Sequence, residues 1–187
     1  MATFEVVTPR LVLTPLQAND AEAMLTYRSD PEVCRYQGWE PATLEDVRRF
    51  IDQMQTVTFD TPGTWYQLAV RLQDSHELVG DLGVHFPEDM EHQVEIGFTI
   101  GPLHQGNGYA TEAVTGLLDH LLLTMQKHRV FASVDPRNKP SLALLDRLGM
   151  RREAHFRESL WFKGEWVDDV VYGLLSSEWS ERRGRSG

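Results

Sequence analysis

The 187-residue chain has a single cysteine, Cys34, and therefore cannot form an internal disulfide bond. No group of Cys and His residues has the spacing of a zinc site, so we expect no metal. Apolar runs such as the one at residues 121–123 are far shorter than the roughly 20 residues that cross a bilayer. The N-terminus has neither a basic flank nor an apolar run, so we expect no secretory signal peptide. These absences favour a cytoplasmic protein with no membrane partner.

Positive charge is also scarce, with 18 Lys and Arg against 28 Asp and Glu and a net charge of -10. A nucleic-acid binder needs a basic face to displace counterions, so we expect no nucleic-acid partner. Hydrophobic residues make up 41% of the chain, as in globular domains. At roughly 100–200 residues per domain, we expect one domain over residues 1–178. The tail over residues 179–187 has little to bury and is expected to be disordered.

Apolar periodicity predicts a strand, two helices and then three strands in the first half of the chain. Pro9 and Pro15 bound the first strand, and Pro31 ends the first helix. Thr43, three residues before Asp46, is similar to a capping box and begins the second helix. The linkers between the three strands are short enough for an antiparallel meander. The expected elements are strand 10–14, helices 21–29 and 44–54, and strands 65–71, 77–86 and 93–100.

The second half alternates helices with strands. A broad apolar stripe from Ala110 to Met125 predicts a long helix that lies on a sheet. A buried strand follows at 129–134, and then a helix that Asn138 can cap and Gly149 can end. Strands near 150–158 and 166–174 close the chain around a turn at Lys163-Gly164. The order predicts an α+β fold with a mixed, mostly antiparallel sheet of about seven strands, flanked by about four helices.

The segment from residue 98 to residue 110 is the most informative about chemistry. A strand ends at Phe98-Thr99-Ile100, and a loop containing Gly106 and Gly108 leads into the longest helix. The first N–H groups of a helix lack internal partners and suit an anion, above all a phosphate, which glycines let approach closely. An ordinary glycine turn is the alternative. The triphosphatase pattern and the third glycine of the dinucleotide fingerprint are both absent.

Three segments together resemble the GCN5-related N-acetyltransferases (GNAT). Gln105-Gly106-Asn107-Gly108-Tyr109-Ala110 matches Q/R-x-x-G-x-G/A, the acyl-CoA pyrophosphate loop of that family, and residues 94–100 resemble its fourth strand. Asn138, Ser141 and Leu148-Gly149-Met150 resemble its N-x-x-A/S…LGF helix. Thr8-Pro9-Arg10-Leu11 with Leu13 is similar to the opening of the ribosomal-protein acetyltransferase (RimJ/RimL-like) branch. The resemblance covers about residues 8 to 179.

The resemblance implies a GNAT fold and an acetyl-CoA-dependent N-acyltransferase. By this resemblance, the Asn138 side chain would bind the pantetheine arm or its thioester end, in addition to capping a helix. The edge of the preceding strand would hydrogen-bond pantetheine as an added strand, through Phe98, Thr99 and Ile100. Backbone amides of the loop would hold the pyrophosphate, and these belong to Gln105, Gly106, Asn107, Gly108, Tyr109 and Ala110.

Acetyl transfer needs a proton acceptor for the amine and can use a proton donor for the leaving thiolate. Many family members place a Tyr donor seven residues after the Asn, where this chain has Leu145. The ribosomal branch has a Ser three residues after the Asn, which implies Ser141 as the donor; a plain first-turn serine is the alternative. The resemblance implies Glu95 as the base. Strict alternation turns Glu95 away from its apolar neighbours, and a β-bulge could redirect it. The alternative bases are His85, Asp81 and a water chain.

The implied reaction is transfer of an acetyl group from acetyl-CoA to a primary amine, by direct attack in a ternary complex. The acceptor would be a protein N-terminus or a small-molecule amine, and the protein a monomer or homodimer. Trp39, Trp161 and Trp166 could line the acceptor pocket, although Trp is commonly a core residue. The alternative is an acyl-CoA sensor without turnover, which Leu145 favours, whereas Ser141 keeps catalysis possible.

Overall fold

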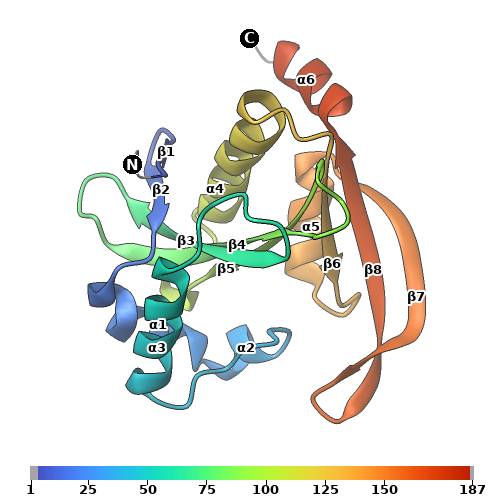
Figure 1. Cartoon of the computed structure of the whole chain (residues 1–187). Coiled ribbons are helices and arrows are strands. Elements are labelled where there is room, and N and C mark those ends of the chain that lie inside the picture. Colours follow the sequence, from blue (N-terminus) through green and yellow to red (C-terminus); the bar gives the residue numbers. More distant parts are fainter. Residues whose placement is uncertain (1–3, 186–187) are drawn as a thin grey trace.

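The computed structural model of the chain describes residues 4–185, and within them one sheet has eight strands in the order β1-β2-β3-β4-β5-β6-β8-β7 (Figure 1). All neighbouring strands are antiparallel except β5 and β6, which are parallel. The predicted mixed α+β fold is confirmed, with a two-residue strand, β1, beyond the expected seven. The strands are β1 (Val6–Val7), β2 (Leu11–Pro15), β3 (Thr64–Leu72), β4 (Leu78–Phe86), β5 (Gln93–Ile100), β6 (Arg129–Val134), β7 (Arg151–Phe162) and β8 (Glu165–Leu175).

Six α-helices flank the sheet within the same residues, two more than predicted, because the short α2 and the C-terminal α6 were not foreseen. Helix α4 continues directly into a π-helical segment over Asp119–Thr124. In the part of the chain that the structure describes, no helix combines the length and the hydropathy needed to cross a bilayer. The helices are α1 (Ala21–Arg28), α2 (Pro31–Cys34), α3 (Leu44–Gln55), α4 (Tyr109–Leu118), α5 (Lys139–Leu148) and α6 (Ser176–Gly184).

The two faces of the sheet carry different helices. Successive side chains of a strand point to opposite faces, and in β3 Leu68 and Val70 belong to a large apolar cluster with α4 and α5. Ala69 between them belongs to a smaller cluster with α1 and α3. Figure 1 shows α4 on one side of the sheet and the α1–α3 pair on the other. Polar side chains of the central strands therefore face α1 and α3.

Local sequence signals set several helix ends as predicted. Thr43 Oγ1 accepts a hydrogen bond from the Asp46 N–H (3.2 Å), and the Asp46 carboxylate accepts one from the Thr43 N–H (2.9 Å). Asn138 caps α5, and Gly149 ends it in the left-handed conformation (φ 79°). These contacts join residues close in sequence, so the pattern alone could predict them.

The prediction of a disordered tail from residue 179 is wrong for residues 179–184, which form most of α6. The Trp179 side chain is buried in the large apolar cluster, and its indole N–H donates to Asp119 Oδ1 (2.9 Å). Arg183 forms an ion pair with Asp119 Oδ2 (2.7 Å). The buried indole of Trp179 and the Asp119 carboxylate, which contacts both Trp179 and Arg183, hold α6 against the rest of the fold. Residues 186 and 187 lie outside the described residues.

Candidate active site

Strands β5 and β6 separate partway along their length. Their parallel pairing joins residues 93–95 to residues 129–131 and ends at Glu95 and Phe131. Beyond that point β5 continues to Ile100, paired only with β4, while β6 stays paired with β8 through Val134. An unpaired strand edge can hydrogen-bond an extended chain as an added strand. Phe98 and Thr99 lie in this part of β5, which pairs with β4 and not with β6.

Ile100 differs from its two neighbours. Its carbonyl oxygen accepts a hydrogen bond from Gln105 Nε2 (2.9 Å). The Gln105 side chain is thus turned back onto the end of β5, and the Ile100 carbonyl is already occupied. A ligand in the gap would find its backbone partners chiefly at Phe98 and Thr99.

The loop over residues 101–108, predicted to bind a phosphate and called the phosphate loop below, joins β5 to α4. Gly106 and Gly108 adopt left-handed conformations, with φ of 78° and 80°. Gly108 is the N-cap of α4, and no side chain caps the first turn. Asn107 Nδ2 donates to the carbonyl oxygens of His104 and Gln105 (3.1 and 3.2 Å), which fixes the curl of the loop. The first N–H groups of α4 are therefore available to an anion.

Gly108→Ala should weaken CoA binding tenfold or more, about 1.4 kcal/mol upward. A Cβ on Gly108 would meet only Arg10 Nη2, at an ordinary 3.5 Å, so the conflict lies in the backbone conformation and in the approach of the ligand. Calorimetry measures the affinity. Gly164→Ala is the matched control, because Gly164 has φ 88° and open space around it in the β7–β8 turn. Equal CoA affinity in wild type and Gly108→Ala would rule out this loop as the phosphate site.

Asn138 and Ser141 lie together at the start of α5. Asn138 Oδ1 accepts a hydrogen bond from the Ser141 N–H (3.3 Å), so the predicted capping role is confirmed. Within residues 4–185 neither Asn138 Nδ2 nor the Ser141 hydroxyl has a further hydrogen-bond partner, and both side chains are partly exposed. Leu145 is fully buried in the core, so it belongs to the packing of α5. The two polar groups can serve a ligand without disturbing the cap.

Glu95 and His85 form a pair across β4 and β5. They are direct neighbours in the ladder, and His85 Nδ1 lies 3.2 Å from Glu95 Oε2. Trp65, the next residue in the same row, stacks on the His85 ring at 4.8 Å between centres and 10° between planes. The side chains of His85 and Glu95 are 26% and 23% exposed. The contact with the stacked His85 ring holds the Glu95 carboxylate in place where β5 and β6 begin to separate.

The suggested bulge at Glu95 is wrong. The β4–β5 register runs without interruption from Glu95 to Ile100. Alternation therefore places Glu95 on the face opposite Val94 and Ile96, both of which are buried in the large cluster. That face carries α1 and α3 and no α4, so the carboxylate needs no bulge to reach the open side of the gap.

Asp81 is structural, and its position rules it out as an alternative base. It is fully buried and accepts hydrogen bonds from Tyr27 Oη (2.5 Å), from Arg28 and from Gln67 Nε2. Burial opposes the charge on Arg28, but the Asp81 carboxylate outweighs it and raises the pKa of the guanidinium. Its oxygens are committed to these donors and are not free to take a proton from a substrate.

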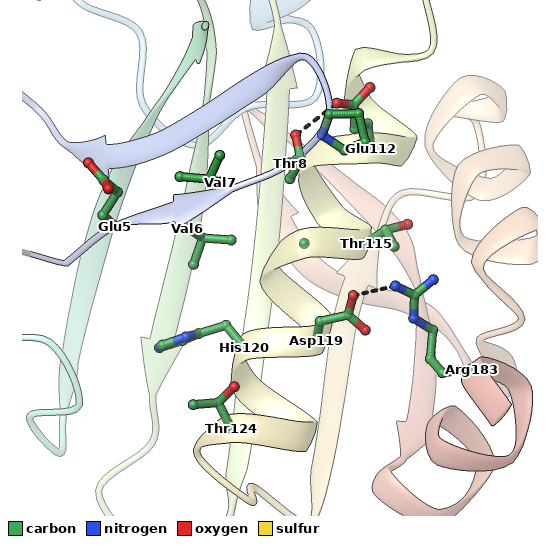
Figure 2. Close-up of a pocket in the computed structure, with 12 residues that line it drawn as sticks. Glu5, Val6, Val7, Thr8, Glu112, Thr115, Asp119, His120, Thr124 and Arg183 are labelled. Carbon is green, nitrogen blue, oxygen red and sulfur yellow. Dashed lines mark hydrogen bonds and ion pairs between the residues drawn. The ribbon is translucent and has the colours of Figure 1, made fainter. Parts of the chain in front are cut away.

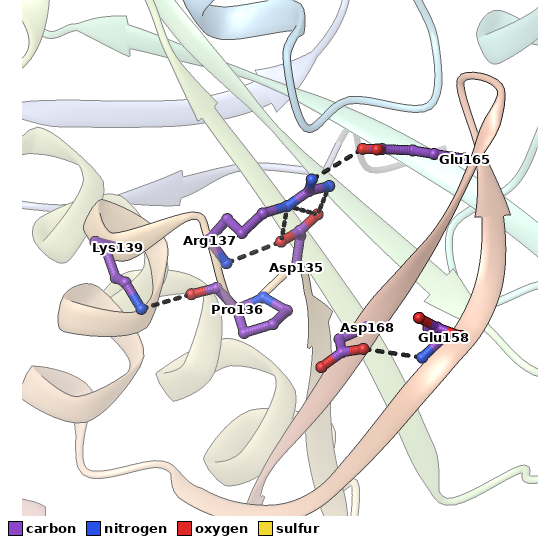
Figure 3. Close-up of polar contacts among 7 residues, drawn as sticks. All are labelled: Asp135, Pro136, Arg137, Lys139, Glu158, Glu165 and Asp168. Carbon is purple, nitrogen blue, oxygen red and sulfur yellow. Dashed lines mark hydrogen bonds and ion pairs between the residues drawn. The ribbon is translucent and has the colours of Figure 1, made fainter.

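The tip of the β7–β8 hairpin meets the end of α2. Lys163 Nζ donates to the carbonyl oxygen of Cys34 (2.8 Å) and pairs with Glu40 (2.9 Å). Arg137, just before Asn138, bridges Asp135 (2.6 Å) and Glu165 (2.8 Å), as Figure 3 shows. A recess of about 200 Å³ lies between these elements, lined by Arg35, Tyr36, Arg137, Phe162, Lys163 and Glu165. The hairpin, α2 and the loop before α5 thus surround one opening.

The three tryptophans proposed for the acceptor pocket fall into two groups. Trp39 stacks on Phe50 (4.4 Å) at the edge of the smaller apolar cluster. Trp161 and Trp166 form an edge-to-face pair on the hairpin and are 62% and 59% exposed. Trp65, whose ring stacks on His85, was not predicted as a site residue. No sequence motif marks Trp65; its place beside the site follows only from its pairing with His85 across β3 and β4.

A larger groove of about 590 Å³ lies elsewhere, between residues 5–9 and the outer side of α4 (Figure 2). Thr8 donates to Glu112 on one wall, and Arg183 pairs with Asp119 on another. None of its lining residues belongs to β5, β6 or the phosphate loop. Within residues 4–185, no three His, Cys, Asp or Glu side chains are grouped so that they could hold a metal ion.

Known proteins resemble this chain in sequence and in fold. The model of the acetyltransferase (GNAT) domain matches residues 10–151. The uncharacterized N-acetyltransferase p20 of Bacillus licheniformis is 31% identical over 92% of this chain and 97% of its own length. The ribosomal protein uS5-alanine N-acetyltransferase of Escherichia coli is 27% identical over 94% and 93%. A GNAT-family acetyltransferase from Bacillus anthracis has a crystal structure with TM-score 0.84 and 30% identity, over 94% and 100% of the two chains.

Proposed function

The chain belongs to the acetyltransferase (GNAT) family, and on that premise we propose that it transfers an acetyl group from acetyl-CoA to a primary amine by direct attack in a ternary complex. One observation carries the proposal: the unpaired edge of β5 begins directly after Glu95, at residue 96, and ends at the phosphate loop. Five residues of strand span about 17 Å at 3.3–3.4 Å each. An extended donor on that edge would have its phosphates and its reacting end at opposite ends of the gap.

The chain's residues fit acetyl-CoA, which supplies the acetyl group as a thioester. The open N–H groups of residues 105–110 suit the diphosphate. The edge of Phe98 and Thr99 suits the amide-bearing pantetheine arm, and the unpartnered Asn138 Nδ2 can donate to one of its carbonyl groups. Together these contacts would place the thioester between β5 and β6.

Glu95 is proposed as the group that takes the proton of the amine. It stands where the gap begins, it is partly exposed, and His85 and Trp65 hold it in position. The amine then attacks directly, and no enzyme-bound acetyl group forms. Cys34 offers no rival nucleophile, because its thiol donates to the Arg28 carbonyl oxygen (2.6 Å) and burial raises its pKa.

Ser141→Ala should lower kcat by about 10²-fold, the low end of the 10²–10⁴ range for general acid catalysis, because thiolate is already a fair leaving group. Acetyl-CoA affinity should stay the same, since the lost contact matters chiefly in the transition state. Steady-state kinetics and calorimetry measure the two quantities. Ser177→Ala, also a first-turn helix serine, is the control. Unchanged kcat in Ser141→Ala would remove this serine from the mechanism.

The proposed acceptor is a protein N-terminus or a small-molecule amine, entering from the face of Glu95 between the hairpin tip and α2. The relative that acetylates the alanine of ribosomal protein uS5 supports including an Ala-initiated peptide among the candidates. A panel of peptides, aminoglycosides, polyamines and amino acids, with mass-spectrometric detection of the product and measurement of released thiol, tests the proposal. Acetylation of any of these amines at a rate that depends on Glu95 would support it.

A sensor that binds acyl-CoA without turnover is the second candidate. The burial of Leu145 favours it, because the position that many relatives fill with a catalytic Tyr here belongs to the core. The same panel separates the two functions. Tight CoA binding without thiol release for every amine would favour the sensor over the enzyme.

A further inference from the structure

Arg10 links the start of β2 to the phosphate loop and to α4. Its Nη1 donates to the carbonyl oxygen of Asn107 (3.0 Å), and its Nε pairs with Glu112 Oε2 (2.6 Å). The guanidinium also lies 4.8 Å from the centre of the Tyr109 ring, within the range of a cation–π contact. One side chain from the N-terminal segment thus holds three parts of the loop–helix junction.

One nitrogen of this guanidinium is unused. Nη2 has no hydrogen-bond partner within residues 4–185, whereas Nε and Nη1 each have one. It lies 3.5 Å from the position that a Cβ on Gly108 would take. The side chain is 50% exposed. A charged donor therefore stands open to solvent beside the uncapped first turn of α4.

The phosphate loop provides no other cation at this place. The first position of the Q/R-x-x-G-x-G/A motif can be Gln or Arg. Here it is Gln105, whose side-chain amide donates to the Ile100 carbonyl oxygen. His104, the only basic type among residues 101–108, directs Nε2 toward Glu77 at 3.4 Å. Arg147 Nη1 donates to Thr111 Oγ1 (3.1 Å) on the first turn of α4, whereas Arg10 contacts the loop itself at Asn107, so Arg10 is the cation on the loop side of the helix amides.

We propose that Arg10 binds the diphosphate of acetyl-CoA through Nη2 while its other nitrogens hold the loop in the binding shape. The inference rests on the proposed function and adds a ligand-binding residue from outside the loop motif. An Arg fork suits the task, because it can hold the loop and donate to a phosphate oxygen at the same time.

Glu112 places a negative charge in the first turn of α4, beside the proposed diphosphate site. Partial burial opposes its ionisation, but hydrogen bonds from Thr8 and Arg10 more than compensate and hold the pKa of Glu112 below its usual value. An ionised carboxylate in the first turn of α4 stabilises the helix, yet it repels a diphosphate bound there. Arg10 offsets that charge and supplies the donor, and these two actions can be separated by substitution.

Titration of CoA and of pantetheine, which lacks the diphosphate, tests the proposal on the full chain. Arg10→Gln should bind CoA about 10–100-fold more weakly and pantetheine as the wild type does. Arg10→Lys should recover part of the CoA affinity, because Lys keeps the charge without the fork. The double variant Arg10→Gln/Glu112→Gln should remain weak toward CoA. Arg48→Gln, an exposed change on α3 that alters the net charge equally, is the control.

Three results would overturn the proposal. The first is wild-type CoA affinity in Arg10→Gln. The second is an equal loss for pantetheine, which would mean that the loop has collapsed. The third is recovery of CoA affinity in the double variant, which would mean that Arg10 only masks Glu112. If the wild-type protein itself does not bind CoA, the proposed function fails instead.

Discussion

Glu95→Gln should lower kcat by about 10²–10⁴, the usual scale for loss of a general base, with acetyl-CoA affinity unchanged. The amide keeps the size of the side chain and its contact with His85, but it cannot take a proton from the amine. Steady-state kinetics with the best acceptor found in the panel measures the effect. Glu77→Gln is the matched control, because Glu77 also pairs with a histidine, His104, at 3.4 Å.

The pH dependence of the same variant separates chemistry from packing. If Glu95 is the base, its replacement should change the acidic limb of the kcat/KM profile as well as the rate. His85→Gln should lower the rate less, since His85 positions the carboxylate and does not itself take the proton. A Glu95→Gln enzyme with wild-type rate and an unchanged profile would point to a water chain as the proton acceptor.

Asp81→Ala should destabilise the protein by about 3–5 kcal/mol, the cost of leaving a buried charge without its partner. The substitution leaves the buried Arg28 guanidinium without its carboxylate partner, and it also removes the acceptor for Tyr27 Oη and Gln67 Nε2. Urea denaturation measures the free energy of unfolding, and thermal unfolding should shift by roughly 2–4 °C per kcal/mol. Glu32→Ala, which breaks an exposed ion pair at 4.0 Å, should change stability by less than about 0.5 kcal/mol.

The same variant tests the assignment of Asp81 as a structural residue. At a temperature where Asp81→Ala is still folded, kcat should remain within a few-fold of wild type. A stable Asp81→Ala protein with kcat lowered as in Glu95→Gln would reverse the roles of the two carboxylates.

The elements that sequence predicted well are those fixed by nearby residues. The capping box at Thr43 and Asp46 and the end of α5 at Gly149 need only contacts within a few positions. Helix α6 was missed because it depends on the burial of Trp179 and its bond to Asp119, 60 residues away. Strand β7 was predicted too short because nearly all its side chains are exposed, so its length follows from pairing with β8 and leaves no apolar pattern.

The candidate site shows the same division. The glycine loop before α4 and the cap by Asn138 are local, and the sequence predicted both with their residues, whereas phosphate binding by the loop stays a prediction. The choice between Glu95, His85 and Asp81 could not be made from sequence, because all three lie on the same face by alternation. The register pairs Glu95 with His85 and leaves Asp81 hydrogen-bonded to Tyr27 of α1, and the choice of Glu95 as the base stays a prediction. Arg10 donates a hydrogen bond to the Asn107 carbonyl oxygen, 97 residues away in sequence, and no sequence motif predicts a contact over that separation.

A crystal structure of the protein with bound CoA tests the central claim most directly. The diphosphate should lie on the amides of residues 105–110 beside Arg10 Nη2, and the pantetheine arm should run along Phe98 and Thr99 with its sulfur between Glu95 and Ser141. CoA bound in the groove between residues 5–9 and α4, with the β5–β6 gap filled by protein or water, would contradict it.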